Sequence, residues 1–183
     1  SGQEMIVSRT GNISLEGTSA NTNVAGINVV TGNSTSKLGY DGTNAFTGNI
    51  TLNSNTFIQY EGAIKANNLD LLGAGVNYTL TNVANDVASL TASAGNINYV
   101  DSNALTTGAI ASSGTVRIST VTGDLTVSED ISTTDTSSSA VVLIAASGTA
   151  AGTATGGNVT IASGKTITAG NNGRVVIYTG SVN

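Results

Sequence analysis

A short phrase recurs along this chain, and it constrains the fold more than any other feature. The phrase is Gly-Asn or Gly-Asp followed by an apolar, a polar and an apolar residue. Full copies begin at Gly11, Gly48, Gly95, Gly123 and Gly157, and looser copies begin at Asn67, Gly114 and Gly173. A turn followed by a short alternating strand, reused many times, is typical of stacked supersecondary units. The sequence therefore predicts a repeat architecture.

The apolar residues suit a narrow column of strands. Hydrophobic residues make up 39% of the chain, but aromatic residues are only 4% and Trp is absent. Charged residues are 9%, against the usual quarter, so hydroxyls and amides must cover the surface. A low-charge chain rich in Ser, Gly and Asn can also be disordered. Strict period-2 runs of β-branched residues favour a folded chain here.

Strand candidates are short, frequent and bounded by turn residues. They cover residues 13–15, 24–30, 37–40, 50–52, 56–60, 63–66, 69–72, 76–80, 87–91, 97–100, 104–106, 116–120, 124–128, 131–133, 140–145, 158–162, 166–169 and 174–179. The only helix candidate is 83–90, where Asn82 or Asn85 could cap a single turn.

The spacing of the repeats gives a coil length. We interpret the larger gaps, from 11 to 48, from 48 to 95 and from 123 to 157, as two coils each, so that one coil takes roughly 20 residues. The predicted fold class is all-β, a right-handed parallel β-helix (β-solenoid) of about eight coils. Residues 1–183 would form a single segment of this kind. The start at Ser1 without Met predicts a mature product or a piece excised from a longer repetitive chain.

Stacking explains how such thin coils become stable. Side chains such as Ile13, Ile50 and Val159 would point inward and form a continuous column, while the alternating Ser and Thr stay solvated. The Asn after the repeat glycine tolerates left-handed backbone and bonds nearby peptide groups, which suits a turn. We hypothesise that these Asn side chains also stack into ladders. They are Asn12, Asn49, Asn96 and Asn158.

The repeated phrases resemble the filamentous-haemagglutinin-type β-helix repeats of large bacterial surface adhesins. Residues 78–87, 125–133 and 173–182 are similar to recurrent units of such proteins, and the resemblance covers most of the chain. It implies an exported protein that forms a long right-handed parallel β-helix and presents binding regions to host cells, neighbouring cells or matrix. The family has no catalytic residues to carry over.

The expected function is a non-catalytic structural and adhesive segment of an exported bacterial surface protein, located extracellularly or at the cell surface. Its expected partners are a host or neighbouring cell surface, a glycan or the extracellular matrix, with possible end-to-end self-association because neither end of the stack shows a cap. Net charge of −5 with six Lys and Arg disfavours nucleic acid. No apolar run reaches membrane-span length, so membrane insertion is not expected.

Insertions at 32–44 and 135–139 are the expected places for partner contacts. No cofactor or metal is expected. Without Cys there is no thiolate site, and without His there is no serine–histidine catalysis.

Three alternative functions remain open: a carbohydrate-active β-helix enzyme, a self-assembling filament subunit and an ice-binding solenoid. The enzyme would use the densest acidic cluster, with Arg117 as the basic residue of a lyase. The cluster could also bind Ca²⁺ weakly, although solvated turns explain it as well. Its members are Asp124, Glu129, Asp130 and Asp135.

Other motifs have a purely structural explanation as well as a functional one. Residues 163–166 (Ser-Gly-Lys-Thr) end like a phosphate-binding loop, but the required glycine is Val159, so a turn is favoured. Thr-x-Thr pairs start at Thr79, Thr120, Thr153 and Thr166 and could form an ice-binding grid. Exposed tyrosines could stack on sugar rings, although partly buried Tyr is commoner. The tyrosines are Tyr40, Tyr60, Tyr78, Tyr99 and Tyr178.

Overall fold

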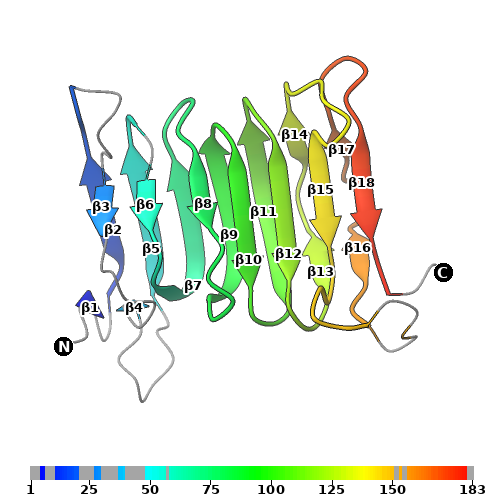
Figure 1. Ribbon diagram of the computed structural model, residues 1–183, viewed down its shortest axis with the longest axis horizontal. Helices are drawn as coiled ribbons and strands as arrows, with labels where there is room; N and C mark the ends of the chain where they lie inside the picture. The colour runs from blue at the N-terminus through cyan, green and yellow to red at the C-terminus, as the bar shows by residue number, and fades with distance from the viewer. Residues whose placement is uncertain are drawn as a thin grey trace.

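The computed structural model of the chain is a parallel β-solenoid (Figure 1). It describes residues 5–6, 11–20, 27–29, 37–39, 48–56, 58–150, 153 and 156–180. None of these residues is helical, so this part of the chain is all-β. It accordingly contains no helix with the length and apolarity that a membrane crossing would need.

Two parallel sheets build the walls of the solenoid. The seven-stranded sheet runs in the order β3 (Ile27–Val29), β6 (Ile58–Tyr60), β8 (Tyr78–Leu80), β10 (Ile97–Asp101), β12 (Val116–Thr120), β15 (Val141–Ile144) and β18 (Val175–Tyr178). The eleven-stranded sheet follows the order β1 (Met5–Ile6), β4 (Lys37–Leu38), β7 (Ala63–Leu72), β9 (Asp86–Ala94), β11 (Leu105–Ser112), β13 (Leu125–Val127) and β16 (Val159–Ile161). β2 (Ile13–Gly17), β5 (Asn49–Ser54), β14 (Ile131–Thr133) and β17 (Ile167–Thr168) join that sheet off its main path.

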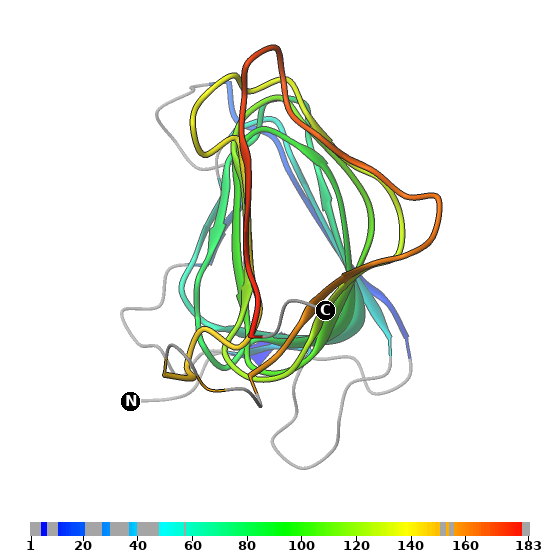
Figure 2. The ribbon, with the colours of Figure 1, turned by 90° about the vertical axis from the view of Figure 1, so that its right-hand side faces the viewer.

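Viewed end-on, the stack has three sides (Figure 2). The seven-stranded sheet forms one side and the eleven-stranded sheet wraps the other two. The long strands β7, β9 and β11 bend around a corner, and the register between β9 and β11 shifts between Thr107 and Ile110. The predicted separate strands 63–66 and 69–72 are therefore one bent strand, β7. The predicted strand 104–106 likewise continues to Ser112.

The register confirms a basic coil of about 20 residues. Tyr78 pairs with Ile97, which pairs with Val116 in the next coil. Ile13, however, pairs directly with Ile50, so positions 11 to 48 span one enlarged coil. The same holds for 123 to 157, where β13 and β16 are neighbours. The two-coil interpretation of these two gaps is wrong, because a corner can take an insertion while its flanking strands stay in register. Between 48 and 95 the register does show two coil steps, since Ile50 pairs with Leu69 and Leu69 pairs with Leu90. The count of eight coils is not confirmed.

Inward side chains form continuous apolar columns along the axis. One column follows the register from Ile50 through Leu69 and Leu90 to Thr107 and Val127, and every member is fully buried. Burying one such aliphatic side chain contributes about 1.5–3 kcal/mol. The prediction that Ile13 and Ile50 point inward is confirmed, whereas Val159 is only partly buried.

The predicted helix at 83–90 is wrong. Val83 and Ala84 form a turn, Val83 is 65% exposed, and β9 begins at Asp86. β9 pairs with β7 on one side and β11 on the other, and these ladders outweigh the weak capping pattern. Tyr40 and most of the predicted loop 32–44 lie outside the described residues.

The repeat glycines are needed because backbones approach closely. A Cβ at Gly95 would lie 2.6 Å from the carbonyl of Gly75, and one at Gly157 would lie 1.9 Å from the oxygen of Gly123. Real Cβ atoms do not reach such distances. The phrase therefore begins with glycine where one coil rests directly on its neighbour.

The Asn after the repeat glycine acts through its side chain. Asn12 Oδ1 accepts the Asn49 N–H at 2.9 Å, and Asn96 Oδ1 accepts the Thr115 N–H at 2.7 Å. Among the described non-glycine residues, positive φ occurs only at Ala146 and Asn172, so none of the Asn residues that follow the repeat glycines has the expected left-handed backbone. Each contact joins two coils, as the ladder hypothesis requires.

Candidate functional site

The outward side chains of the seven-stranded sheet change from polar to apolar toward β18. On β10 the side chains alternate between buried and half-buried, but on β15 the outward Val142 is only 7% exposed. Asn98, Arg117, Val142 and Val176 follow one another in register on this outer face. A strand that is apolar on both faces indicates that something packs against its outside.

The same wall carries an insertion between β15 and β16. The same corner of earlier coils takes only residues 81–85 and 102–104, whereas here it takes 145–158. Its first part is tied to β12, because the Ala146 N–H donates to Thr120 Oγ1 at 2.9 Å and the Ser147 N–H donates to Thr120 O at 2.8 Å. Ala146 has a φ of 52°, which turns the chain out of the regular coil.

A groove of about 630 Å³ lies between this insertion and the outer strands. That volume is in the range of ordinary small-molecule sites. Its described lining consists of Arg117, Ile144, Ala145, Ala146, Ser147, Thr149, Ala150, Thr153, Gly156, Ile177, Tyr178, Thr179 and Gly180. The groove therefore combines one cation, one aromatic ring, several hydroxyls and an apolar floor.

Arg117 and Tyr178 are the two groups with binding chemistry in this groove. Tyr178 is 57% exposed, and Arg117 is exposed on β12. Within the described residues the ion pairs are Lys65–Asp86 and Lys165–Glu129, so no carboxylate there neutralises the Arg117 guanidinium. Arg117 is in register with Val142 and, one strand further, with Val176. Tyr178 follows Val176 by two positions, so Arg117 and Tyr178 are two strands apart and offset by two residues along the strand. Strand spacing and rise then separate their Cα atoms by roughly 12 Å.

The other described tyrosines do not offer a ligand surface. Tyr78 and Tyr99 are buried inside the solenoid. The Tyr78 hydroxyl donates to Leu72 O at 2.5 Å and Leu52 O at 2.9 Å, and burial raises the pKa of Tyr78. Tyr40 and the side chain of Tyr60 lie outside the description. A groove lined by several tyrosines is thus not what the structure presents; Tyr178 contributes alone.

The predicted acidic cluster is spread along the coil corners. Asp124 Oδ1 accepts the Asn158 N–H at 2.8 Å, and Asp130 Oδ1 accepts the Thr166 N–H at 2.8 Å. These bonds to Thr166 lower the pKa of Asp130. Asp135 instead caps its own turn through Ser137. Among the described residues, no three His, Cys, Asp or Glu side chains are grouped to hold a metal ion.

The Ser-Gly-Lys-Thr motif contains a turn, as the sequence predicted. Residues 163 and 164 turn the chain between β16 and β17, with Gly164 at a φ of 77°. Lys165 Nζ pairs with Glu129, whose carboxylate raises the pKa of Lys165. Lysine and the following threonine are thus both used to join this coil to the previous one.

The Thr-x-Thr pairs do not share one surface. Thr79 lies on β8 in the seven-stranded sheet, whereas Thr168 lies on β17 in the eleven-stranded sheet. Thr120 is fully buried and its hydroxyl donates to Gly123 O at 2.9 Å. Thr155 lies outside the described residues. An ice-binding grid would therefore need other threonines.

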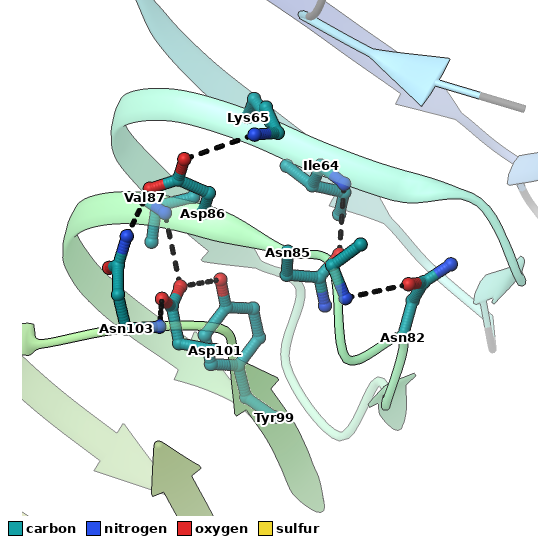
Figure 3. Close-up of polar contacts among 10 residues, drawn as sticks. Ile64, Lys65, Asn82, Asn85, Asp86, Val87, Tyr99, Asp101 and Asn103 are labelled. Carbon is teal, nitrogen blue, oxygen red and sulfur yellow. Dashed lines mark hydrogen bonds and ion pairs between the residues drawn. The ribbon is translucent and has the colours of Figure 1, made fainter. Parts of the chain in front are cut away.

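A buried polar network occupies the corner between β10 and β11 (Figure 3). Asp101 is fully buried, and its carboxylate accepts the Tyr99 hydroxyl at 2.8 Å, the Val87 N–H at 3.0 Å and the Asn103 N–H at 3.1 Å. Burial raises the pKa of Asp101 to about 6, against the opposing pull of these donors. Burial likewise raises the pKa of Tyr99.

Asn85 forms a similar buried hydrogen-bond network one coil earlier. Its Oδ1 accepts the Ile64 N–H at 2.9 Å, and its Nδ2 donates to Leu80 O at 3.1 Å and Val100 O at 3.0 Å. Three successive coils are thus joined through one side chain. Perturbed carboxylates can mark active sites, but Asp101 and Asn85 have no exposed surface. Their geometry is that of buried structural residues whose side chains bond the backbone of neighbouring coils.

The groove was missed from the sequence, although one signal for it was present. Residues 140–146 form the longest apolar run in the chain, and this run lacks the alternation of the other strands. Loss of alternation indicates burial on both faces, which in an exposed solenoid wall requires a covering element.

No protein-family model, no curated protein and no solved structure matches this chain.

Proposed function

We propose that this chain is a non-catalytic structural and adhesive segment of an exported bacterial surface protein, acting as a rigid stalk that presents or forms a binding surface. The observation that carries the proposal is the ladder of parallel strands, with buried apolar columns inside it and buried polar side chains that bond neighbouring coils at the corners. Most backbone groups of such a ladder are bonded between coils, so few segments open easily.

Two finer features belong to this proposal. Right-handed winding is expected because parallel strands joined through crossovers are almost always right-handed. A rod of about eight coils at roughly 4.8 Å per coil would be about 40 Å long. Both suit a spacer that holds a binding surface away from a cell.

An adhesion assay tests the proposal. Beads that carry the folded chain are expected to adhere to at least one of three surfaces: animal cells, bacterial cells, or films of matrix proteins and glycans. The same beads after thermal unfolding of the chain provide the control. Equal adherence of folded and unfolded beads to every surface would contradict an adhesive role that depends on the fold.

Self-association is a second candidate, favoured by the exposed apolar side chains of the last coil. Ile161, Val175 and Ile177 are 38–42% exposed, although their register partners Val127, Val141 and Leu143 are fully buried. A second copy stacked on this coil would continue the columns. Sedimentation should show concentration-dependent assembly that Ile177→Lys abolishes. A monomer at all concentrations would contradict this candidate.

The enzyme and ice-binding alternatives have no specific observation in their favour. Of the carboxylates that an enzyme would use, Asp124, Glu129 and Asp130 join neighbouring coils and Asp135 caps its own turn. The threonine pairs lie on different sheets. Incubation with acidic polysaccharides tests the first through product release. Thermal hysteresis tests the second.

A further inference from the structure

The described residues of the insertion between β15 and β16 help to line a groove that a plain stalk does not need. Arg117 and Tyr178 lie in the lining of this one groove. The chain carries six Lys and Arg against eleven Asp and Glu. Arg117 has no carboxylate partner among the residues that the structure describes, and such a cation in an acidic protein points to an anionic ligand. Arginine matches a carboxylate with two parallel hydrogen bonds, which makes a carboxylate a suitable anion.

The backbone limits where an extended peptide could bind in this groove. β12 is paired with β10 and β15, and β15 is paired with β12 and β18, so neither strand offers the free edge on which peptides add as a strand. Among the described strands of this sheet, β18 is the end strand beside the groove, and a peptide could add there. A ligand lying over β12 and β15 must be held by side chains instead.

The groove side chains suit a sugar ring. The exposed Tyr178 ring presents a flat apolar face with a polar tip, which can pack against the C–H face of a pyranose. Ser147 Oγ donates to Thr120 O and Thr153 Oγ1 donates to Ala150 O, both at 2.8 Å. Each hydroxyl keeps lone pairs that can accept from a sugar hydroxyl.

We propose that this groove binds a glycan that contains carboxylated sugars, with Arg117 holding a sugar carboxylate and Tyr178 packing against a ring. This inference rests on the adhesive function proposed above and names the ligand class of its binding surface. The separation of roughly 12 Å between the two Cα atoms leaves room for one ring between the ends of their side chains.

Calorimetric titration of the 183-residue chain with trigalacturonic acid tests the proposal. Saturable binding is expected, and the carboxyl-reduced trisaccharide should bind at least tenfold more weakly. Arg117→Gln and Tyr178→Leu should each weaken binding of the acidic trisaccharide at least tenfold. Arg174→Gln is the matched control, because Arg174 is exposed but does not line the groove. Melting curves establish that each variant folds.

Three results would overturn the inference: equal affinity for the acidic and neutral trisaccharides, unchanged binding by Arg117→Gln, or equally tight binding of triglutamate. The bead assay separates this failure from failure of the proposed function. If Arg117→Gln beads adhere as strongly as wild-type beads and trigalacturonic acid does not compete, the ligand assignment is wrong while the adhesive role stands. If wild-type beads never adhere, the adhesive role itself fails.

Discussion

At the scale of single residues, Thr107 is out of place in its column. Its register neighbours Leu90 and Val127 are aliphatic and fully buried. Thr107 Oγ1 is the buried side-chain oxygen, among the described residues, that lacks a hydrogen-bond partner. A buried hydroxyl without a partner carries the full cost of leaving water.

Thr107→Val should therefore stabilise the chain by about 1 kcal/mol, because it keeps the shape and removes the unbonded hydroxyl. Urea unfolding measures the change. Thr133→Val is the control, since the Thr133 hydroxyl donates to Gly114 O and accepts the Asp135 N–H at 3.0 Å. It should destabilise by a similar amount. Destabilisation by Thr107→Val would show that the hydroxyl is bonded after all.

Asp101 makes stability depend on pH. Its pKa in the folded chain is about 6, above the ordinary value of 3.8, because burial favours the protonated form. The stability from this group is fully present below about pH 4 and is lost as pH rises through 6. The total loss is about 3 kcal/mol. The groups facing Asp101 are Tyr99, Asp86 and Asn103.

Asp101→Asn should flatten the decline in stability between pH 4 and pH 7, whatever its effect on absolute stability. Melting temperatures across this range provide the measurement. Asp130→Asn is the contrasting control, because the lowered pKa of Asp130 gives stability that is lost as pH falls. An unchanged decline in Asp101→Asn would assign the pH dependence to another group.

At the scale of elements, side chains at the corners add to the strand ladders that join neighbouring coils. Asn96 shows this most clearly, since its Oδ1 accepts the Thr115 N–H while its Nδ2 donates to Asn77 Oδ1 at 2.9 Å. β10, β12 and the turn before β8 are thus joined at one position. Side-chain bonds to backbone N–H groups at such ends are worth about 1 kcal/mol each.

Asn96→Ala should cost about 1–2 kcal/mol, because it removes both bonds and leaves the Thr115 N–H without its acceptor. The control is Asn98→Ala on the outward face of β10, which should change stability by less than about 0.5 kcal/mol. Equal effects of the two substitutions in chemical denaturation would sink the ladder hypothesis for the repeat Asn.

Sequence patterns predicted the elements better than their connections. The strands 116–120 and 131–133 match β12 and β14, because period-2 alternation between turn residues is a local signal. Enlarged coils were miscounted, since the distance between two phrases does not reveal whether a coil lies between them. The groove lies where residues 146–148 bond to Thr120 and Val121, and the Asp101 network depends on contacts between coils. The Asp101 network leaves no local pattern, and the lost alternation at 140–146 does not reveal which segment packs against that strand.

At the scale of the whole molecule, the stacking of coils in register explains both the stability of the core and the tolerance of the surface for insertions. Parallel coils in register bury continuous columns, so the stack behaves as a single rod, and its walls are free to carry insertions. Insertions at a corner leave the columns intact, as the pairing of β13 with β16 across residues 128–158 demonstrates. A β-solenoid can therefore gain a surface groove without changing its core.

Cysteine pairs test this arrangement most directly, because the chain has no cysteine of its own. Thr79 and Asn98 are register partners on neighbouring coils, whereas Arg117 lies one coil further along the same outer line. Paired strands lie about 4.8 Å apart, within reach of a disulfide, while two strand spacings exceed the limit of about 7 Å. Mild oxidation should close Thr79→Cys/Asn98→Cys almost completely and leave Thr79→Cys/Arg117→Cys open. Efficient closure of the second pair, or failure of the first, would contradict the stacked parallel register.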